Sequence, residues 1–187
     1  DHHRNLEKEV EKRTIELASA NKMLELRHRR LRVLSELSLE QFKDETHLFT
    51  TISDNACSIL DADIAILGKK KDSNSTILAI SGNDRDLIKK HISLKQRLEQ
   101  ITNEEEREIV VHDIHDDQSI TVSVGKEAIV YNTIIRVNIF VNDQFFGALC
   151  LLSQKKKAFT DQDVEVLEIL RKILTAELER KEGEDRK

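Results

Sequence analysis

The N-terminal part of the chain repeats an apolar position every seven residues. From about residue 5 to residue 39 nearly all residues are good helix formers, and one heptad column is apolar: Val10, Leu17, Leu24 and Leu31. Such a column places one apolar stripe along a helix and is typical of a coiled coil. We therefore expect a parallel coiled-coil helix over residues 1–36.

The heptad column beside this stripe is polar and includes Asn21. An asparagine that faces its symmetry mate specifies two strands and a fixed register at some cost in stability. At a flanking position the same residue would lie in water. The pattern leaves both interpretations of Asn21 open.

After residue 37 the apolar period changes several times. Helical spacing continues over 37–60 and returns over 84–101, and a loop or short helix is expected at 115–125. Strands are expected at 64–67, 76–81, 107–114, 131–141 and 144–153. The last two strands are apolar at nearly every position, so both faces of their sheet need cover. The pair Asn142 and Asp143 between them predicts a two-residue hairpin.

A long helix is expected at the C-terminal end. Thr160 is a natural N-cap, and Asp163 three residues later completes a capping-box arrangement. Apolar residues follow at helical spacing: Val164, Leu167, Leu170, Leu174 and Leu178.

Composition narrows the class of protein. The 187 residues include no proline, and 35% are charged, which favours uninterrupted helices. No apolar run reaches the roughly 18 residues of a membrane span, and two cysteines cannot staple a secreted mini-domain. The net charge is −5, and the basic run 27–32 is flanked by glutamates on a helix. We expect a cytoplasmic fragment of a longer polypeptide, without nucleic-acid or membrane contact.

Four segments together resemble a GAF domain with a signalling helix. LFTTISDNACSILDADIAIL (48–67) resembles the first helix and strand of that family, and IVVHDIHDD (109–117) resembles its Val-rich strand. The hairpin with Gly147 followed by AFTDQDVEVLEILRKILTAELER (158–180) resembles its C-terminal third. LEKEVEKRTIELASANKML (6–24) is similar to the helices that join sensor domains in bacterial two-component and cyclic-dinucleotide proteins.

The resemblance implies an α+β, PAS-related fold with an antiparallel sheet of five or six strands. Helices at 42–59 and 160–180 would cover one face, and residues 84–126 would cover the ligand-binding face. It implies domains at 1–36 (signalling helix), 37–180 (GAF domain) and 181–187 (linker to an output domain). It also implies a homodimer whose terminal helices pair through Val10, Leu17, Asn21, Leu24, Leu31, Leu167 and Leu174.

Known cofactors of the family need groups that this chain lacks or places poorly. Cys57 is expected in mid-helix and Cys150 in a strand, so both are expected to be small buried hydrophobes, and no covalent bilin is expected. The cyclic-nucleotide pattern is incomplete, because Phe159 and Asp163 are followed by Val164 in place of glutamate. We expect no cyclic nucleotide.

The one dense group of metal-capable residues is His112, Asp113, His115, Asp116 and Asp117. In a strand His112 and His115 would point to opposite faces, which is poor for one ion, although a loop beginning at Asp113 could bring them together. An aspartate capping a helical turn is the favoured interpretation, and we expect neither haem nor metal.

Arg136 and Asn138 are expected on one face of a strand that is otherwise apolar. They could meet an anionic or amide-bearing ligand, with Tyr131 and His112 nearby, or they could face solvent at a poorly covered rim. GAF strands often have Val-Pro-Leu where this chain has Val137-Asn138-Ile139.

The sequence has no nucleophile-elbow motif, no phosphate-binding glycine-rich loop and no visible carboxylate pair in a turn context. The expected function is therefore sensory and not enzymatic: a module that binds a small ligand or relays a signal to an output domain, most often a histidine kinase. A diguanylate cyclase or phosphodiesterase output and a ligand-free dimerisation role are alternatives. An enzyme of the free-methionine-sulfoxide-reductase type is disfavoured, since Cys57 and Cys150 are expected in regular elements.

Overall fold

The computed structural model describes residues 2–71, 74–82, 104–113, 120–124, 127–155 and 159–185. It divides into two compact units, Asp1–Glu40 and Gln41–Lys187. The first unit is one helix, α1 (His2–Leu39), which extends the expected coiled-coil helix by three residues beyond 36. Among the elements that the structure describes, the other helices and all of the strands belong to the second unit.

Helix α2 (Glu45–Ile59) starts after a break that the sequence pattern did not predict. The expected continuous helix over 37–60 is interrupted at residues 40–44. Asp44 adopts an extended conformation, and its carboxylate accepts a hydrogen bond of 2.7 Å from the His47 N–H. This N-cap satisfies a donor that the first helical turn leaves unpaired. The apolar spacing continues across the break, whereas the helix does not.

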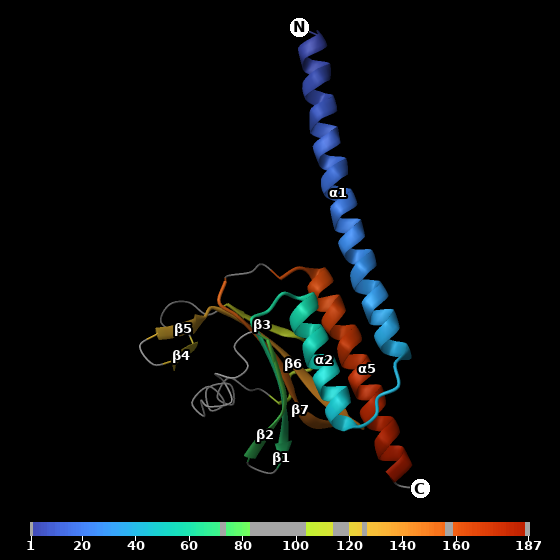
Figure 1. Ribbon diagram of the computed structural model, residues 1–187, viewed down its shortest axis with the longest axis vertical. Coiled ribbons are helices and arrows are strands. Elements are labelled where there is room, and N and C mark those ends of the chain that lie inside the picture. Colours follow the sequence, from blue (N-terminus) through green and yellow to red (C-terminus); the bar gives the residue numbers. More distant parts are fainter. Residues whose placement is uncertain are drawn as a thin grey trace. The chain divides into compact units, whose positions relative to one another are not determined.

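The main sheet has five strands, all antiparallel, in the order β2-β1-β7-β6-β3 (Figure 1). Their bounds are β1 Ile64–Lys71, β2 Asn74–Gly82, β3 Val110–Asp113, β6 Thr133–Val141 and β7 Gln144–Ser153. This confirms the expected antiparallel α+β architecture. The turn between β6 and β7 is the predicted two-residue hairpin, and Asn142 and Asp143 have φ values of 50° and 67°. Two such left-handed residues form the turn type whose twist matches the strands.

A second, two-stranded sheet pairs β4 (Ile120–Val124) with β5 (Glu127–Tyr131). It corrects two expectations. The stretch 115–125 contains a strand where a loop or short helix was expected. Tyr131 ends β5 and does not begin β6, because Asn132 lies between the two strands and donates its backbone N–H to the carbonyl of Ser153 at 2.9 Å.

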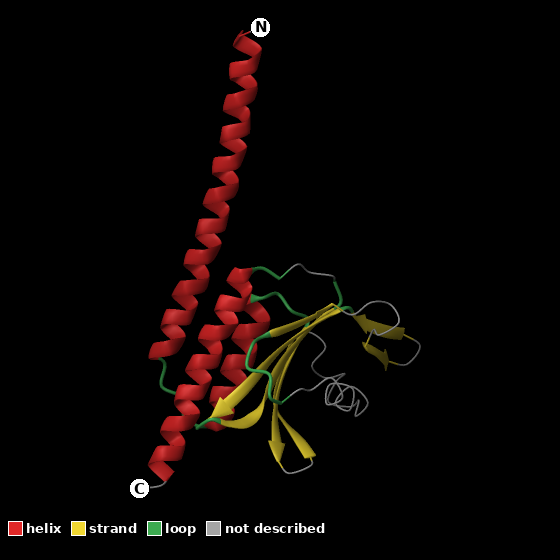
Figure 2. Ribbon diagram, turned by 180° about the vertical axis from the view of Figure 1, so that it is seen from behind, coloured by secondary structure: helices red, strands yellow, loops and turns green. Residues whose placement is uncertain are grey.

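Helices α2 and α5 (Asp161–Asp185) lie on the same side of the sheet (Figure 2). Helix α2 packs mainly on β1 and β2, and α5 packs on β6. The predicted capping box is present, since Thr160 N–H donates to Asp163 Oδ2 at 2.9 Å and Asp163 N–H donates to Thr160 Oγ1 at 3.4 Å. Residues 181–185, expected to be a linker, continue α5. The expected cover of the other face by 84–126 falls largely outside the described residues.

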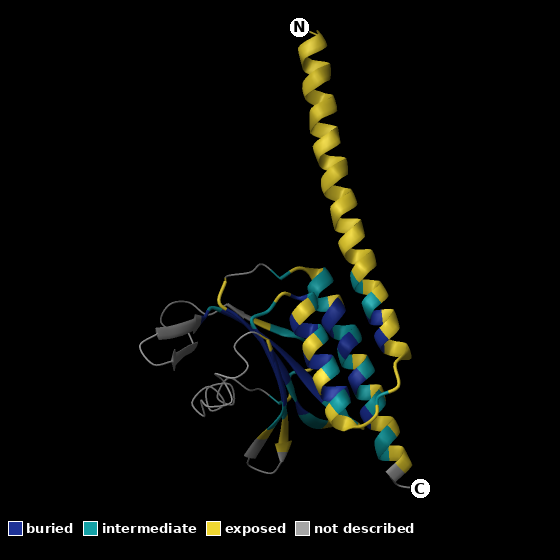
Figure 3. Cartoon of the chain, in the orientation of Figure 1, coloured by how far each residue is buried: buried dark blue, intermediate teal, exposed yellow. Residues whose placement is uncertain are grey.

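The core is concentrated on the two central strands and the helical side of the sheet (Figure 3). All residues of β6 from Thr133 to Ile139 are buried. Leu167 and Leu174, expected on a dimer interface, are 1% and 0% exposed. This corrects the expectation, because side chains so fully buried have no surface left for a second chain. Heptad spacing in α5 serves packing inside the chain.

Gly147 in β7 allows the close approach of β1. A Cβ at this position would lie 1.9 Å from the carbonyl oxygen of Gly68. We expect Gly147→Ala to lower the free energy of unfolding by roughly 1–3 kcal/mol, because the neighbouring backbone has to move. Chemical denaturation measures this change.

Gly183→Ala is the matched control, because a Cβ there has no neighbour within 4 Å. It should be neutral or stabilise the protein by up to about 1 kcal/mol through helix propensity. Equal destabilisation by both substitutions would contradict the steric argument.

Candidate functional site

One face of the main sheet points away from α2 and α5. Ser81 of β2 donates a hydrogen bond to Asp54 of α2, so the alternate residues of the sheet, including Ile80, point to the opposite side. On that side Tyr131, Ile134 and Cys150 belong to one cluster of buried residues. Arg136 and Asn138 follow Ile134 at two-residue spacing on the same side of β6. Three residues predicted for a ligand pocket, Tyr131, Arg136 and Asn138, therefore share this face.

Arg136 and Asn138 form a buried, hydrogen-bonded pair. Their exposed fractions are 4% and 2%, which rules out the alternative of a solvent-exposed rim. Arg136 Nε donates to Asn138 Oδ1 at 2.9 Å, and Asn138 Nδ2 donates to the backbone carbonyl of Glu106 at 2.8 Å. Pairing of this kind is what makes buried polar side chains tolerable.

The charge of Arg136 affects its neighbours. Burial lowers the pKa of Arg136, while Cys150, directly opposite in the β6–β7 register, and Glu104 oppose that change. Burial also raises the pKa of Cys150 to about 11, and the attraction of Arg136 for the thiolate offsets part of the rise. Arginine remains charged at neutral pH, so this face carries a fixed positive charge next to a neutral thiol.

The segment before β3 supplies the contacts that sequence reasoning missed. Arg107 stacks its guanidinium 3.9 Å from the ring centre of Phe140 and forms a 3.0 Å ion pair with Asp143. Its backbone carbonyl accepts a hydrogen bond of 2.8 Å from Arg171 of α5. In the sequence this segment is a run of charged residues, and no spacing or motif distinguishes it from a solvated loop.

The fourth predicted pocket residue, His112, lies in β3 opposite Ile134 in the register. Its side chain and the residues His115, Asp116 and Asp117 lie outside the part that the structure describes. Within the described part, no three histidine, cysteine, aspartate or glutamate side chains converge on a point suited to a metal ion.

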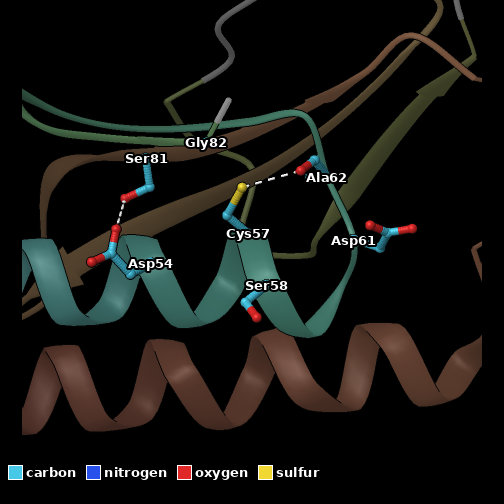
Figure 4. Close-up of a pocket in the computed structure, with 7 residues that line it drawn as sticks. All are labelled: Asp54, Cys57, Ser58, Asp61, Ala62, Ser81 and Gly82. Carbon is cyan, nitrogen blue, oxygen red and sulfur yellow. Dashed lines mark hydrogen bonds between the residues drawn. The ribbon is translucent and has the colours of Figure 1, made fainter. Parts of the chain in front are cut away.

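A separate pocket of about 340 Å³ opens on the helical side of the sheet, where α2 meets β1 and β2 (Figure 4). Its polar lining includes the carboxylates of Asp54 and Asp61 and the hydroxyl groups of Ser58 and Ser81; Cys57, Ala62 and Gly82 complete it. The Ser81 hydroxyl donates to Asp54, and the Cys57 thiol donates to the Ala62 carbonyl at 3.1 Å. The lining offers acceptors to water or to a hydrogen-bond donor. None of the four residues predicted for a ligand pocket lines it, and Cys57, which does, was expected only to be a small buried hydrophobe.

Comparison with known proteins defines the family. The model of the GAF domain family matches residues 43–175, which is most of the chain, so the chain belongs to the GAF domain family. No curated protein sequence matches it.

Solved GAF domains have the same fold at low sequence identity. One, assigned to a sensor histidine kinase of Pseudomonas syringae pv. tomato, is 18% identical, with a TM-score of 0.65 over 89% of this chain and 96% of that one. A GAF domain of a phosphoenolpyruvate-protein phosphotransferase from Coxiella burnetii is 15% identical, with a TM-score of 0.59 over 88% and 97% of the two chains. A phycocyanobilin-bound GAF domain of a cyanobacterial phytochrome is 13% identical, with a TM-score of 0.54 over 86% and 95%.

The chain thus has the fold of domains found in sensory and regulatory proteins. Among the described residues no helix has the length and hydropathy required to cross a bilayer. Cys57 and Cys150 are both buried, as their positions in the sequence predicted, and they form no disulfide.

Cys150 should resist alkylation in the folded protein. With a pKa of about 11, about one thiol in a thousand is ionised at pH 8, and its exposed fraction is 8%. The reaction rate at Cys150 should rise nearly tenfold per pH unit between pH 8 and 10. Mass spectrometry of peptides after pulses of iodoacetamide measures the rate at each cysteine separately.

The control is the same pulse in denaturant, where Cys150 should react at the rate of an ordinary exposed thiol. Rapid modification of Cys150 in the folded protein at pH 7 would contradict the burial of this face.

Proposed function

We propose that the chain is the sensory module of a cytoplasmic or cytoplasm-facing histidine kinase and works as a homodimer paired through α1. A change in the GAF domain alters the packing of the paired helices, and the helices pass that change to an output domain. The observation that carries the proposal is the apolar column on α1, which this chain leaves in water.

Helix α1 is exposed along most of its length (Figure 3). The heptad column Val10, Leu17, Leu24 and Leu31 has exposed fractions of 62%, 65%, 63% and 42%. A regular apolar stripe of this length is costly in water and is the usual interface of a coiled coil. The same stripe on a second chain in parallel orientation supplies the missing cover, with residues of equal height facing each other.

Asn21 is exposed on the same helix and lies between two members of the column. It is available to face its symmetry mate, where an amide pair favours two strands in register. Leu167 and Leu174 take no part in this interface, so the proposed pairing depends on α1.

The histidine kinase assignment is supported by the solved GAF domain from Pseudomonas syringae pv. tomato, whose fold this chain shares over 96% of that domain. Diguanylate cyclases and phosphodiesterases remain the alternative output. Sequencing the reading frame beyond Lys187 distinguishes them, since the two enzyme classes have different catalytic motifs.

A ligand-free relay is a second candidate function, and one observation favours it. Both ends of the Asn138 amide are bonded within the chain, to Arg136 and to the Glu106 carbonyl. The Asn138 amide therefore needs no ligand, whereas the buried Nη2 of Arg136 makes no hydrogen bond within the described part of the chain. Native mass spectrometry of freshly purified protein separates the two functions, because a retained small molecule supports the sensory one.

Disrupting the apolar column should abolish dimers. The double variant Leu17→Glu/Leu24→Glu places like charges at two heights of the proposed interface, and we expect at least a hundredfold weaker association. Sedimentation equilibrium of the whole chain measures the dissociation constant.

Ile15→Glu is the matched control, because Ile15 is also apolar and is 70% exposed on α1 but lies away from the column. It should leave association nearly unchanged. A wild-type chain that stays monomeric at high micromolar concentration, or a double variant that dimerises normally, would refute the proposed pairing.

A further inference from the structure

The segment Glu104–Arg107, which begins with a turn at residues 104–105, contacts side chains from both faces of the main sheet. Val110 pairs with Arg136 at the start of β3, so the residues before it continue beside the second half of β6. The ring contact of Arg107 with Phe140 and its ion pair with Asp143 place the segment at this edge. The segment therefore runs along the edge of the sheet, with the Asn138 side of the sheet on one flank and the α5 side on the other.

Two neighbouring carbonyls of the segment accept hydrogen bonds from these opposite faces. The Glu106 carbonyl accepts from Asn138 Nδ2 at 2.8 Å, and the Arg107 carbonyl accepts from Arg171 Nη1 of α5 at 2.8 Å. The two acceptors belong to adjacent peptide units joined at the Cα of Arg107, so a displacement of the backbone at this point shifts both carbonyls, with only the φ and ψ rotations of Arg107 between them.

The two hydrogen bonds differ from the surface ion pairs around them. Asn138 is 2% exposed, and loss of its acceptor would leave a buried donor unsatisfied. The ion pair of Arg107 with Asp143 joins side chains that are 57% and 87% exposed, where such pairs contribute little. The hydrogen bond to Asn138 therefore contributes more to holding the segment in place than the exposed ion pair does.

On the α5 side the donor is held in place. Glu168 pairs with the Arg171 guanidinium, whose side chain is only 18% exposed. The β6–β7 turn adds two contacts further along the same helix: Asn142 N–H donates to Glu179 at 3.1 Å, and Asn142 Nδ2 donates to Glu182 at 2.7 Å. Helix α5 is thus attached to the β6 edge both by the segment and by the turn.

We propose that the Glu106–Arg107 segment couples the buried Arg136–Asn138 pair to helix α5. A rearrangement of the pair moves the Glu106 carbonyl, the neighbouring Arg107 carbonyl moves with it, and the hold of Arg171 on the segment changes. The coupling belongs to the single chain and goes beyond dimerisation, so it stands whether or not α1 pairs.

The first test substitutes a residue of helix α5 and measures the effect on the buried Arg136–Asn138 pair. Arg171→Met removes the donor to the Arg107 carbonyl and keeps an unbranched apolar side chain suited to a partly buried helix position, so the whole chain should fold. Hydrogen exchange of the Asn138 side-chain amide, followed by NMR, reports on its bond to Glu106 across the sheet. We expect exchange at least threefold faster than in the wild type.

Arg180→Met is the matched control, because Arg180 lies on the same helix and pairs with Glu177 and Glu184 of that helix. It should leave the exchange of the Asn138 amide within about 1.5-fold of the wild type. No change in Arg171→Met, or the same change in Arg180→Met, overturns the proposal.

The reciprocal test changes the buried pair. Asn138→Asp keeps an acceptor for Arg136 Nε and removes the donor to Glu106. Backbone amides of α5 around Arg171 should exchange at least threefold faster, relative to amides of the central strand β7. An equal rise at β7 and α5 means general unfolding and counts against coupling, as does a change confined to β6 and β3.

Discussion

The burial of β6 controls much of this structure. Every residue of the strand from Thr133 to Ile139 is buried, although the strand contains an arginine and an asparagine. Polar groups in such a place have to find partners inside the protein. Asn138 accepts from Arg136 and donates to the Glu106 carbonyl, which brings a backbone segment distant in the sequence against the sheet.

That constraint explains contacts that otherwise look unrelated. With the Glu106 carbonyl bonded to Asn138, Arg107 lies beside the β6–β7 turn. There its guanidinium pairs with Asp143, and its backbone carbonyl accepts a hydrogen bond from Arg171 of α5. The helical side of the sheet is packed by leucines, whereas the edge is joined by hydrogen bonds. Apolar packing gives the domain its stability, and the polar edge determines which movements of α5 and β6 occur together.

Local signals in the sequence predicted several elements correctly. Asn142 and Asp143 are suited to the left-handed turn they form, and Thr160 with Asp163 builds the expected capping box. These features depend on neighbouring residues alone. The break before α2 was missed because apolar spacing continues across it, and only the Asp44 cap distinguishes the two helices.

The candidate site was only partly predictable, because part of it depends on residues far apart in the sequence. Two-residue spacing correctly placed Arg136 and Asn138 on one face, but their burial depends on a partner 32 positions away in a charged run. Likewise, the heptad spacing of Leu167 and Leu174 is shared by coiled coils and by helices that pack on a sheet. Leu167 and Leu174 are 1% and 0% exposed, so in α5 this spacing reflects packing on the sheet. On α1 the apolar column is exposed, as the coiled-coil interpretation expects of a single chain.

The proposed sensory function depends on two α1 helices lying side by side in parallel. Pulsed electron spin resonance on the whole chain, with one nitroxide label at Lys8→Cys, tests this directly, because Cys57 and Cys150 are buried. Parallel helices with axes about 10 Å apart predict a single short distance between the two labels. An inter-chain distance of roughly 35–40 Å or more, as antiparallel helices rising about 1.5 Å per residue would give, or no inter-chain distance at all, would contradict it.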